Sequence, residues 1–461
     1  MLGQEALHGR PLHAFAFAVD EAQVQDRCRA AGVNVRLHRA HHIARRKGVQ
    51  VERAVDGELH FVVSAQPISR NAETVARPCD REAAVRVSSA STVWQTGAVK
   101  VGWEEVRALR LARHHLHERA PRGSELRVVS RICGLHAQLF SSAALSLWAR
   151  VEGATLAGLR RALWEEGTLV KSWAMRGTLH LLPARDLPVY LGALSTYRHY
   201  LTQGWVKYFG LTREEIELVI ATVGKVLRGR VLTRAQLADA VVERTGARKL
   251  GAVLRQGWGV LLKPCAYRGQ LCFAEGEGAR VRFTHPGPMR QLEPERALAE
   301  VARRYLGAYA PATRDDFALW WQGTTRTQAQ RLLESLDVTA VDLAGTRAYL
   351  LAADASPPPL ARSVRLLPAF DPYVVGAPRS GGLFPAAHKA RVFRPQGWIS
   401  PVLLVDGHAE GVWRHERKNG RLQVRIEPFA ALSRRARAQA SEEAARLAVF
   451  LDARLDKVVF A

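Results

Sequence analysis

The sequence predicts a mainly α-helical protein with small β-sheets (α+β), built from tandem winged-helix domains, a small β-rich domain and a C-terminal helix. Two observations favour this fold class. One order of elements, in which helices are followed by two short β-like runs, occurs twice in the middle of the chain. A proline-rich linker then leads into short apolar runs and a final helical stretch. At 461 residues the chain has room for about two to four domains.

Both copies of the repeat begin with helical periodicity, over residues 213–227 and 294–306. A threonine precedes the next helix in each copy, with Gln or Asp three residues later. This is the spacing of a capping box, in which two side chains satisfy free backbone N–H groups at a helix start. The two pairs are Thr233 with Gln236, and Thr313 with Asp316.

Each capped helix is followed by two β-like runs, 266–273 with 280–283 and 338–343 with 347–351. Helices followed by a hairpin are the order of a winged helix, whose second helix enters the major groove of DNA while the hairpin contacts the backbone. Helical pairs with hairpins also occur as structural scaffolds that bind no DNA. The repeat alone does not decide between such a scaffold and a winged helix.

Elements on either side of the repeats complete the prediction. A helix is expected over 104–118, and Ser124 is expected to open the next one after a Pro-Arg-Gly turn. Residues 356–359 form the linker, and an Arg-rich helix is expected over 433–455. The apolar runs between them predict strands at 364–367, 392–393, 398–405 and 421–426.

Charge indicates the kind of partner. The chain has 67 Lys and Arg against 43 Asp and Glu, a formal net charge of +24. An arginine-rich genome contributes to this excess but does not explain the shortage of acids. Because neutralised phosphates release counterions, such a charge favours nucleic acid as the partner, with acidic phospholipid as the weaker rival.

Other patterns narrow the class of protein. The five cysteines have no metal-like spacing, which predicts reduced thiols and a cytoplasmic location. No run of 18 apolar residues occurs, so we expect no membrane partner. No phosphate-binding glycine loop, metal cluster or Ser-His-Asp order is present in the sequence, so we expect no cofactor and no metal. We expect a monomer.

Residues 1–101 differ from the rest of the chain, with poor periodicity and basic tracts such as Arg45-Arg46-Lys47. Two interpretations are open. The segment is a disordered basic arm that grips DNA, or translation begins near Val99 or Val101 and the segment precedes the true start.

Two stretches carry a resemblance to a known family. They are Cys133–Arg150, which contains His-Ala-Gln, and Leu169–Ala184, which contains Arg-Gly-Thr-Leu-His. With the segment Leu367–Tyr373, they make residues 102–461 similar to the AlkZ/YcaQ-like winged-helix DNA glycosylases. The resemblance implies winged helices over 102–210, 211–292 and 293–355, a β-barrel-like domain over 360–430 and a C-terminal helix over 431–461.

The family's active-site signature is a Gln-hydrophobic-Gln triplet that positions a water molecule. The matching residues are His136, Ala137 and Gln138, with His at the first position, a departure that also occurs among AlkZ-like relatives. Side chains two apart in an extended segment point to the same side, whereas in a helix they diverge by about 200°. We therefore expect the triplet in a loop or at a helix boundary. Neutral His136 can accept a proton from the water, and Gln138 can hold it.

The resemblance also suggests residues that contact DNA. Arg176 is a candidate phosphate or lesion-strand contact. Thr178 and His180, two apart in an expected strand, can face the same cleft, although a local structural role for them is equally open. The remaining candidates are Lys171 beside Trp173, and Asp371. The family's Asp-Arg pair after this aspartate is replaced here by Pro378-Arg379-Ser380.

The resulting hypothesis is a monofunctional DNA glycosylase that hydrolyses N-glycosidic bonds of bulky N7-alkylguanine or N3-alkyladenine, crosslinks included. Its partner is double-stranded DNA with alkylated bases. The main alternative is a non-catalytic winged-helix DNA-binding protein or transcriptional regulator, since fold does not fix function. A lesion-binding relative without cleavage activity is the third alternative.

Overall fold

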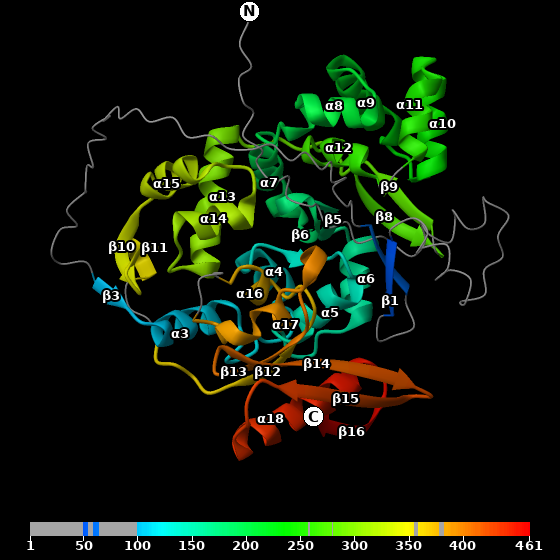
Figure 1. The fold of residues 1–461 in the computed structure, drawn as a ribbon. Coiled ribbons are helices and arrows are strands. Elements are labelled where there is room, and N and C mark those ends of the chain that lie inside the picture. Colours follow the sequence, from blue (N-terminus) through cyan, green and yellow to red (C-terminus); the bar gives the residue numbers. More distant parts are fainter. Residues whose placement is uncertain are drawn as a thin grey trace, which may run out of the picture.

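The computed structural model describes residues 49–53, 59–63, 99–256, 259–278, 280–354, 358–377 and 382–461. In this part the chain is an α+β protein of many helices and small sheets (Figure 1). Strands β1 (Val49–Arg53) and β2 (Leu59–Val63) pair with each other in antiparallel fashion. Apart from these strands and β3 (Val99–Val101), the N-terminal segment 1–101 lies outside the described residues, and so do both interpretations of it.

One order of elements occurs three times in the described chain: a helix, a short strand or bridge, two or three helices, and a hairpin. Module 1 contains α4 (Glu125–Arg131), β4 (Leu135–His136), α5 (Phe140–Trp148), α6 (Leu156–Trp164), β5 (Leu169–Trp173) and β6 (Leu179–Pro183). Module 2 contains α9 (Arg213–Leu227), β7 (Leu232–Thr233), α10 (Arg234–Thr245), α11 (Arg248–Arg255), α12 (Lys263–Tyr267), β8 (Cys272–Glu277) and β9 (Arg280–Thr284). Module 3 contains α13 (Pro294–Tyr309), α14 (Arg314–Trp321), α15 (Arg326–Glu334), β10 (Val338–Leu343) and β11 (Thr346–Leu351).

The small sheets of the modules are also alike. The short strand lies beside the last strand of the hairpin, which gives the orders β4-β6-β5 and β7-β9-β8. In module 3 a bridge between Ala312 and Tyr349 takes the place of the short strand. There β10 also pairs in parallel with β3 (Val99–Val101), which leads into α3 (Trp103–Arg113). Modules 1 and 2 are joined through α7 (Leu187–Leu194) and α8 (Gln203–Phe209).

The expected helix starts are confirmed. Thr233 and Thr313 form capping boxes with Gln236 and Asp316 at the starts of α10 and α14, and Ser124 precedes α4. One expected strand is partly wrong. Residues 266 and 267 end α12, whose proline near the first helical position favours a helix, and the strand begins only at Cys272.

The C-terminal unit is an open sheet. Its strands, in the order β12-β13-β14-β15-β16, are Val364–Leu367, Val402–Val405, His408–Lys418, Arg421–Pro428 and Arg454–Phe460. Three helices accompany them, namely α16 (Pro372–Val375), α17 (Lys389–Val392) and α18 (Arg434–Phe450). The expected barrel is wrong for the described residues, because β12 and β16 are opposite edges of the sheet and α18 packs against β12. The run expected at 392–393 is also not a strand, since Val392 ends α17.

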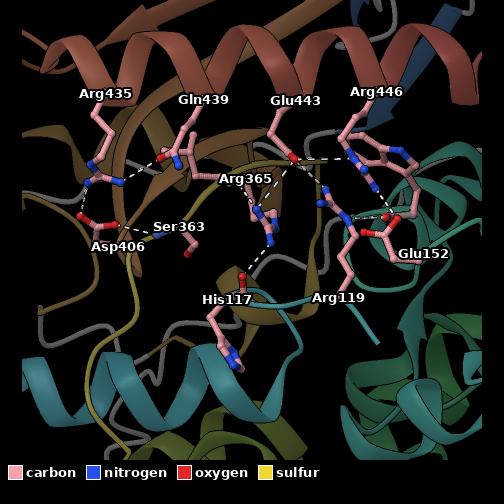
Figure 2. A network of polar contacts seen from close by, with 12 residues as sticks. His117, Arg119, Glu152, Ser363, Arg365, Asp406, Arg435, Gln439, Glu443 and Arg446 are labelled. Atoms are coloured by element: carbon pink, nitrogen blue, oxygen red, sulfur yellow. Dashed lines mark hydrogen bonds and ion pairs between the residues drawn. The ribbon is translucent and has the colours of Figure 1, made fainter. Parts of the chain in front are cut away.

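The last residues of the chain belong to this unit. The expected final helix ends at Phe450 as α18, and β16 then pairs in parallel with β15. Figure 2 shows α18 above the segment between α3 and α4, where Arg119 donates hydrogen bonds to Glu443 of α18 at 2.8 and 2.7 Å. Arg446 of the same helix reaches Glu152 at 2.7 Å. The Arg-rich helix is thus tied to module 1 and to the segment that precedes it by ion pairs.

Module 1 has neighbours on two sides (Figure 1). Its hairpin strand β5 contacts β8 of module 2. On the other side, Leu145, Trp148 and Ala149 in and after α5 pack into the apolar core of the C-terminal unit. No helix in the described part of the chain has the length and apolarity needed to cross a membrane.

Candidate active site

The His-Ala-Gln triplet follows a tight reversal of the chain. After α4, Cys133 and Gly134 adopt positive φ values of 62° and 93° and turn the backbone into β4. A β-carbon at position 134 would lie 2.6 Å from a methyl group of Leu182 and 3.0 Å from the carbonyl oxygen of Leu181. Glycine is required there because the chain crosses β6 at close range in a conformation that other residues rarely adopt.

The triplet itself is extended, as expected from its chemistry. His136 ends β4, and Leu139, with φ −109° and ψ 122°, is the N-cap of α5. The side chains of Leu135 and Ala137 are both 0% exposed and belong to the core of module 1. Because side chains of a strand alternate between its faces, His136 and Gln138 lie on the opposite face together.

His136 is enclosed by aromatic side chains. It is 7% exposed, and its ring stacks on that of Phe370 with centroids 4.9 Å apart and planes at 11°. Across the sheet its register partner is His180 of β6, at a ring distance of 5.3 Å. The Nδ1 atom of His136 is buried and has no hydrogen-bond partner among the described residues. Such an atom is costly to bury, and a bound water molecule would satisfy it.

Gln138 lies beside the same strand. Its side-chain oxygen accepts a long hydrogen bond of 3.5 Å from the backbone N–H of Leu179 at the start of β6. The carboxamide is half-buried. The imidazole and the carboxamide of the triplet therefore both lie along β6, next to His180.

The turn between β5 and β6 places a guanidinium against this pair of histidines. Arg176 adopts a φ of 59° in the turn and donates 2.6 Å to the carbonyl oxygen of Trp320 in module 3. Its other terminal nitrogen lies 3.3 Å from Nε2 of His180. Nδ1 of His180 lies 3.0 Å from the carbonyl oxygen of Thr178, which can only accept, so Nδ1 carries the proton and Nε2 accepts from Arg176.

Both histidines are held neutral. Burial, and then the positive charge of Arg176, lowers the pKa of His180 to about 3. Burial, with His180 and Arg176, also lowers the pKa of His136 well below its ordinary value. A histidine with the ordinary pKa of about 6.5 could remove a proton near neutral pH, but burial takes this basicity from His136. His136 is a neutral hydrogen-bonding group of weak basicity, suited to orient a water molecule more than to remove its proton.

Thr178, Lys171 and Trp173, the other residues considered for contact with DNA, lie in different surroundings. The hydroxyl of Thr178 is half-buried and donates to the carbonyl oxygen of Met175 at 3.1 Å. The ammonium of Lys171 lies 5.4 Å from the centre of the Phe273 ring in module 2. Trp173, considered as a stacking residue, is 8% exposed and packs edge-on against the same ring, as a core residue does.

Asp371 was expected to contact DNA, but in the structure it forms a buried ion pair with Arg150. It is 0% exposed, and its two oxygens accept from the guanidinium of Arg150 at 2.7 and 2.8 Å. A carboxylate closed off in this way cannot reach a duplex. Arg379, named as part of the same segment, lies outside the described residues.

Phe370 and Arg150 could not be recognised from the sequence as part of the site. Phe370 stood in a quoted segment, but no local signal could pair it with a histidine more than two hundred residues earlier in the chain. Arg150 is the last residue of the segment Cys133–Arg150, and nothing in the sequence indicates its partner. Among the described residues, no group of three or more His, Cys, Asp or Glu is arranged to hold a metal ion.

Comparison with known proteins places the chain in a family. The family model described as "DNA glycosylase AlkZ-like" matches residues 129–450. An interstrand DNA cross-link repair glycosylase of Streptomyces sahachiroi is 33% identical over 330 residues, which cover 68% of this chain and 88% of that protein. The solved structure of the Streptomyces sahachiroi DNA glycosylase AlkZ matches with a TM-score of 0.71 and 32% identity, over 79% of this chain and 100% of that one. The chain thus belongs to the AlkZ-like DNA glycosylase family and is a DNA glycosylase.

Proposed function

We propose that this glycosylase is monofunctional and hydrolyses the N-glycosidic bond of alkylated purines, with a water molecule held by His136 and Gln138 as the nucleophile. The observation that carries the proposal is the shared face of these two side chains, with a buried Nδ1 of His136 that has no partner in the described structure. A neutral imidazole and a carboxamide both accept and donate hydrogen bonds, as a bound water requires.

The chemistry suits such a weakly basic site. A purine alkylated at N7 or N3 is cationic and leaves readily, so the bond can break through an oxocarbenium-like state. The water then attacks an electron-poor sugar carbon and needs orientation more than activation. Two neutral histidines also avoid placing further positive charge beside a cationic base.

The proposed substrates are N7-alkylguanine and N3-alkyladenine, with interstrand crosslinks as a more specialised substrate. Support for crosslinks comes from the relative in Streptomyces sahachiroi, whose name gives cross-link repair as its role. For this chain the crosslink is a second substrate to be tested beside the monoalkylated base.

We further infer that the three modules are winged helices, from their shared order of helices and hairpin. In this arrangement the β5–β6 hairpin of module 1 carries Arg176, Thr178 and His180 close to His136, while Lys171 is the register partner of the core residue Leu181 and lies against Phe273 of module 2. We propose that Lys171 and Arg176 contact the backbone of the lesion strand, while Thr178 and His180 order the hairpin that carries them.

The test uses a duplex with a single N7-alkylguanine and a matched duplex with a crosslink, under single-turnover conditions. Released base is measured as alkali-labile strand breaks, and affinity by fluorescence anisotropy. His136→Ala and Gln138→Ala are each expected to lower excision at least about 100-fold and to leave the affinity within about threefold. Native rates of excision in both variants would overturn the site.

A matched control is available in His388. Its ring also stacks on a phenylalanine, Phe429, at 4.4 Å and 7°, but in the C-terminal unit. His388→Ala is expected to excise at the native rate. Tight binding of damaged duplex by the native protein without base release would instead favour a non-catalytic lesion-binding role.

A further inference from the structure

Phe370 has an unusual backbone. Its φ is 57°, in the left-handed region that a bulky side chain rarely adopts. Its backbone N–H donates to the carbonyl oxygen of Ile399 at 3.3 Å, and its ring is 7% exposed between His136 and Trp398. Residues held in such a conformation persist only where their surroundings determine them, and they cluster at functional sites.

The neighbouring residue, Asp371, holds the backbone of Phe370 in this conformation. Asp371 binds Arg150 through both oxygens, and the side chains of both residues are 0% exposed. The same carboxylate accepts from the backbone N–H of Tyr373 at 2.9 Å and so caps α16. Arg150 is fixed in turn at the end of α5, where it donates to the carbonyl oxygen of Ser146 at 2.8 Å. The ion pair therefore joins the helix that follows the triplet to the turn that carries Phe370.

We propose that Phe370 is a positioning residue for His136, held over the imidazole by the Arg150–Asp371 ion pair so that water is excluded from that face of the ring. The ring of Phe370 fixes the plane of the imidazole, and with it the direction in which the ring nitrogens point. This inference rests on the proposed function, in which His136 orients the nucleophilic water.

The consequence is a dependence on pH. The titratable or charged groups facing His136 are His180 on β6 and Arg176 in the hairpin turn, and both oppose its protonation. The Arg150–Asp371 pair behind Phe370 has no net charge. Burial is the largest cause of the lowered pKa. Removing the Phe370 ring admits water, so the pKa of His136 rises towards its ordinary value of about 6.5.

A protonated His136 has lost its lone pair and cannot accept a hydrogen bond from the nucleophilic water. Phe370→Ala is therefore expected to lose about tenfold in excision rate between pH 7.5 and pH 5.5, in addition to any loss at neutral pH. The native enzyme should show no such loss over the same range. Phe370→Tyr, which keeps the flat ring, should resemble the native enzyme.

The experiment measures single-turnover excision from pH 5.5 to 8 and the titration of His136 by NMR on protein labelled at the histidine Cε1 carbon. Phe384→Ala is the matched control, because Phe384 is 4% exposed in the same core and stacks edge-on with Phe393. It should leave both readouts native. Phe370→Leu replaces the alanine variant if that variant fails to fold, with a change in the same direction.

An unchanged His136 titration or an unchanged rate profile in the Phe370 variant overturns the positioning role. Failure of the proposed function looks different, since His136→Ala would then excise at the native rate. In that case the NMR titration still reports whether Phe370 controls the state of His136.

Discussion

Side chains that surround His136 are fixed by contacts between distant parts of the chain. Three residues other than glycine have positive φ near it: Cys133 before β4, Arg176 in the hairpin turn and Phe370 in the C-terminal unit. Each costs backbone energy and is held by a neighbour, as residues at functional sites are. The local signal of the triplet could be read from the sequence. Its enclosure could not, because Phe370 and Arg176 reach it only through tertiary packing.

The buried ion pair gives a prediction at this scale. Asp371→Asn leaves the guanidinium of Arg150 buried without a counter-charge, and breaking such a pair costs about 3–5 kcal/mol. We expect the midpoint of urea unfolding to fall accordingly.

The surface pair of Arg421 and Asp456, 3.6 Å apart with 69% and 41% of their side chains exposed, provides the control. Asp456→Asn should scarcely change the midpoint, because exposed pairs contribute little. A native midpoint in Asp371→Asn together with weakened DNA affinity would restore Asp371 as a DNA contact.

At the scale of elements, sequence patterns were informative where local chemistry decides. Capping threonines placed the starts of α10 and α14, and α9 spans the residues expected for it. Strands were less predictable. Strand β16, Arg454–Phe460, lies at the edge of its sheet, and none of its side chains is fully buried. Its sequence therefore lacks the regular alternation of apolar and polar residues that marks a strand. The open sheet was mistaken for a barrel because pairing partners are set by the whole unit and leave no local signal.

Glu443 is the buried carboxylate at the junction of α18 with module 1 and the segment that precedes it. Glu443 faces Arg119 at 2.7 Å and Arg365 at 3.8 Å, and these three side chains are at most 12% exposed (Figure 2). Burial lowers the pKa of Arg365 to about 10, helped by the charge of Arg119, which shows how closely the cations are packed.

Glu443→Gln removes the charge that balances these arginines. We expect a loss of roughly 2–3 kcal/mol and a melting temperature lower by several degrees, measured by differential scanning fluorimetry. Glu442→Gln, at the exposed neighbouring position of the same helix, should melt like the native protein. Equal melting of the two variants would mean that the junction does not need the carboxylate.

For the whole molecule, the candidate site depends on contributions from three regions. Module 1 supplies the triplet and hairpin, module 3 supplies the carbonyl oxygen that holds Arg176, and the C-terminal unit supplies Phe370. The formal net charge of +24 suits a protein that attracts DNA. The sequence could predict the repeated order and the charge, while the convergence of the three regions on His136 came only with the fold.

The position of the nucleophilic water between His136 and Gln138 can be tested directly. A crystal structure of the protein bound to a duplex with a cationic azaribose in place of the damaged nucleotide would locate the attacked sugar carbon. We predict a water molecule within about 3 Å of both the His136 imidazole and the Gln138 carboxamide, facing that carbon. A sugar bound elsewhere on the protein, or a water held by other side chains, would contradict it.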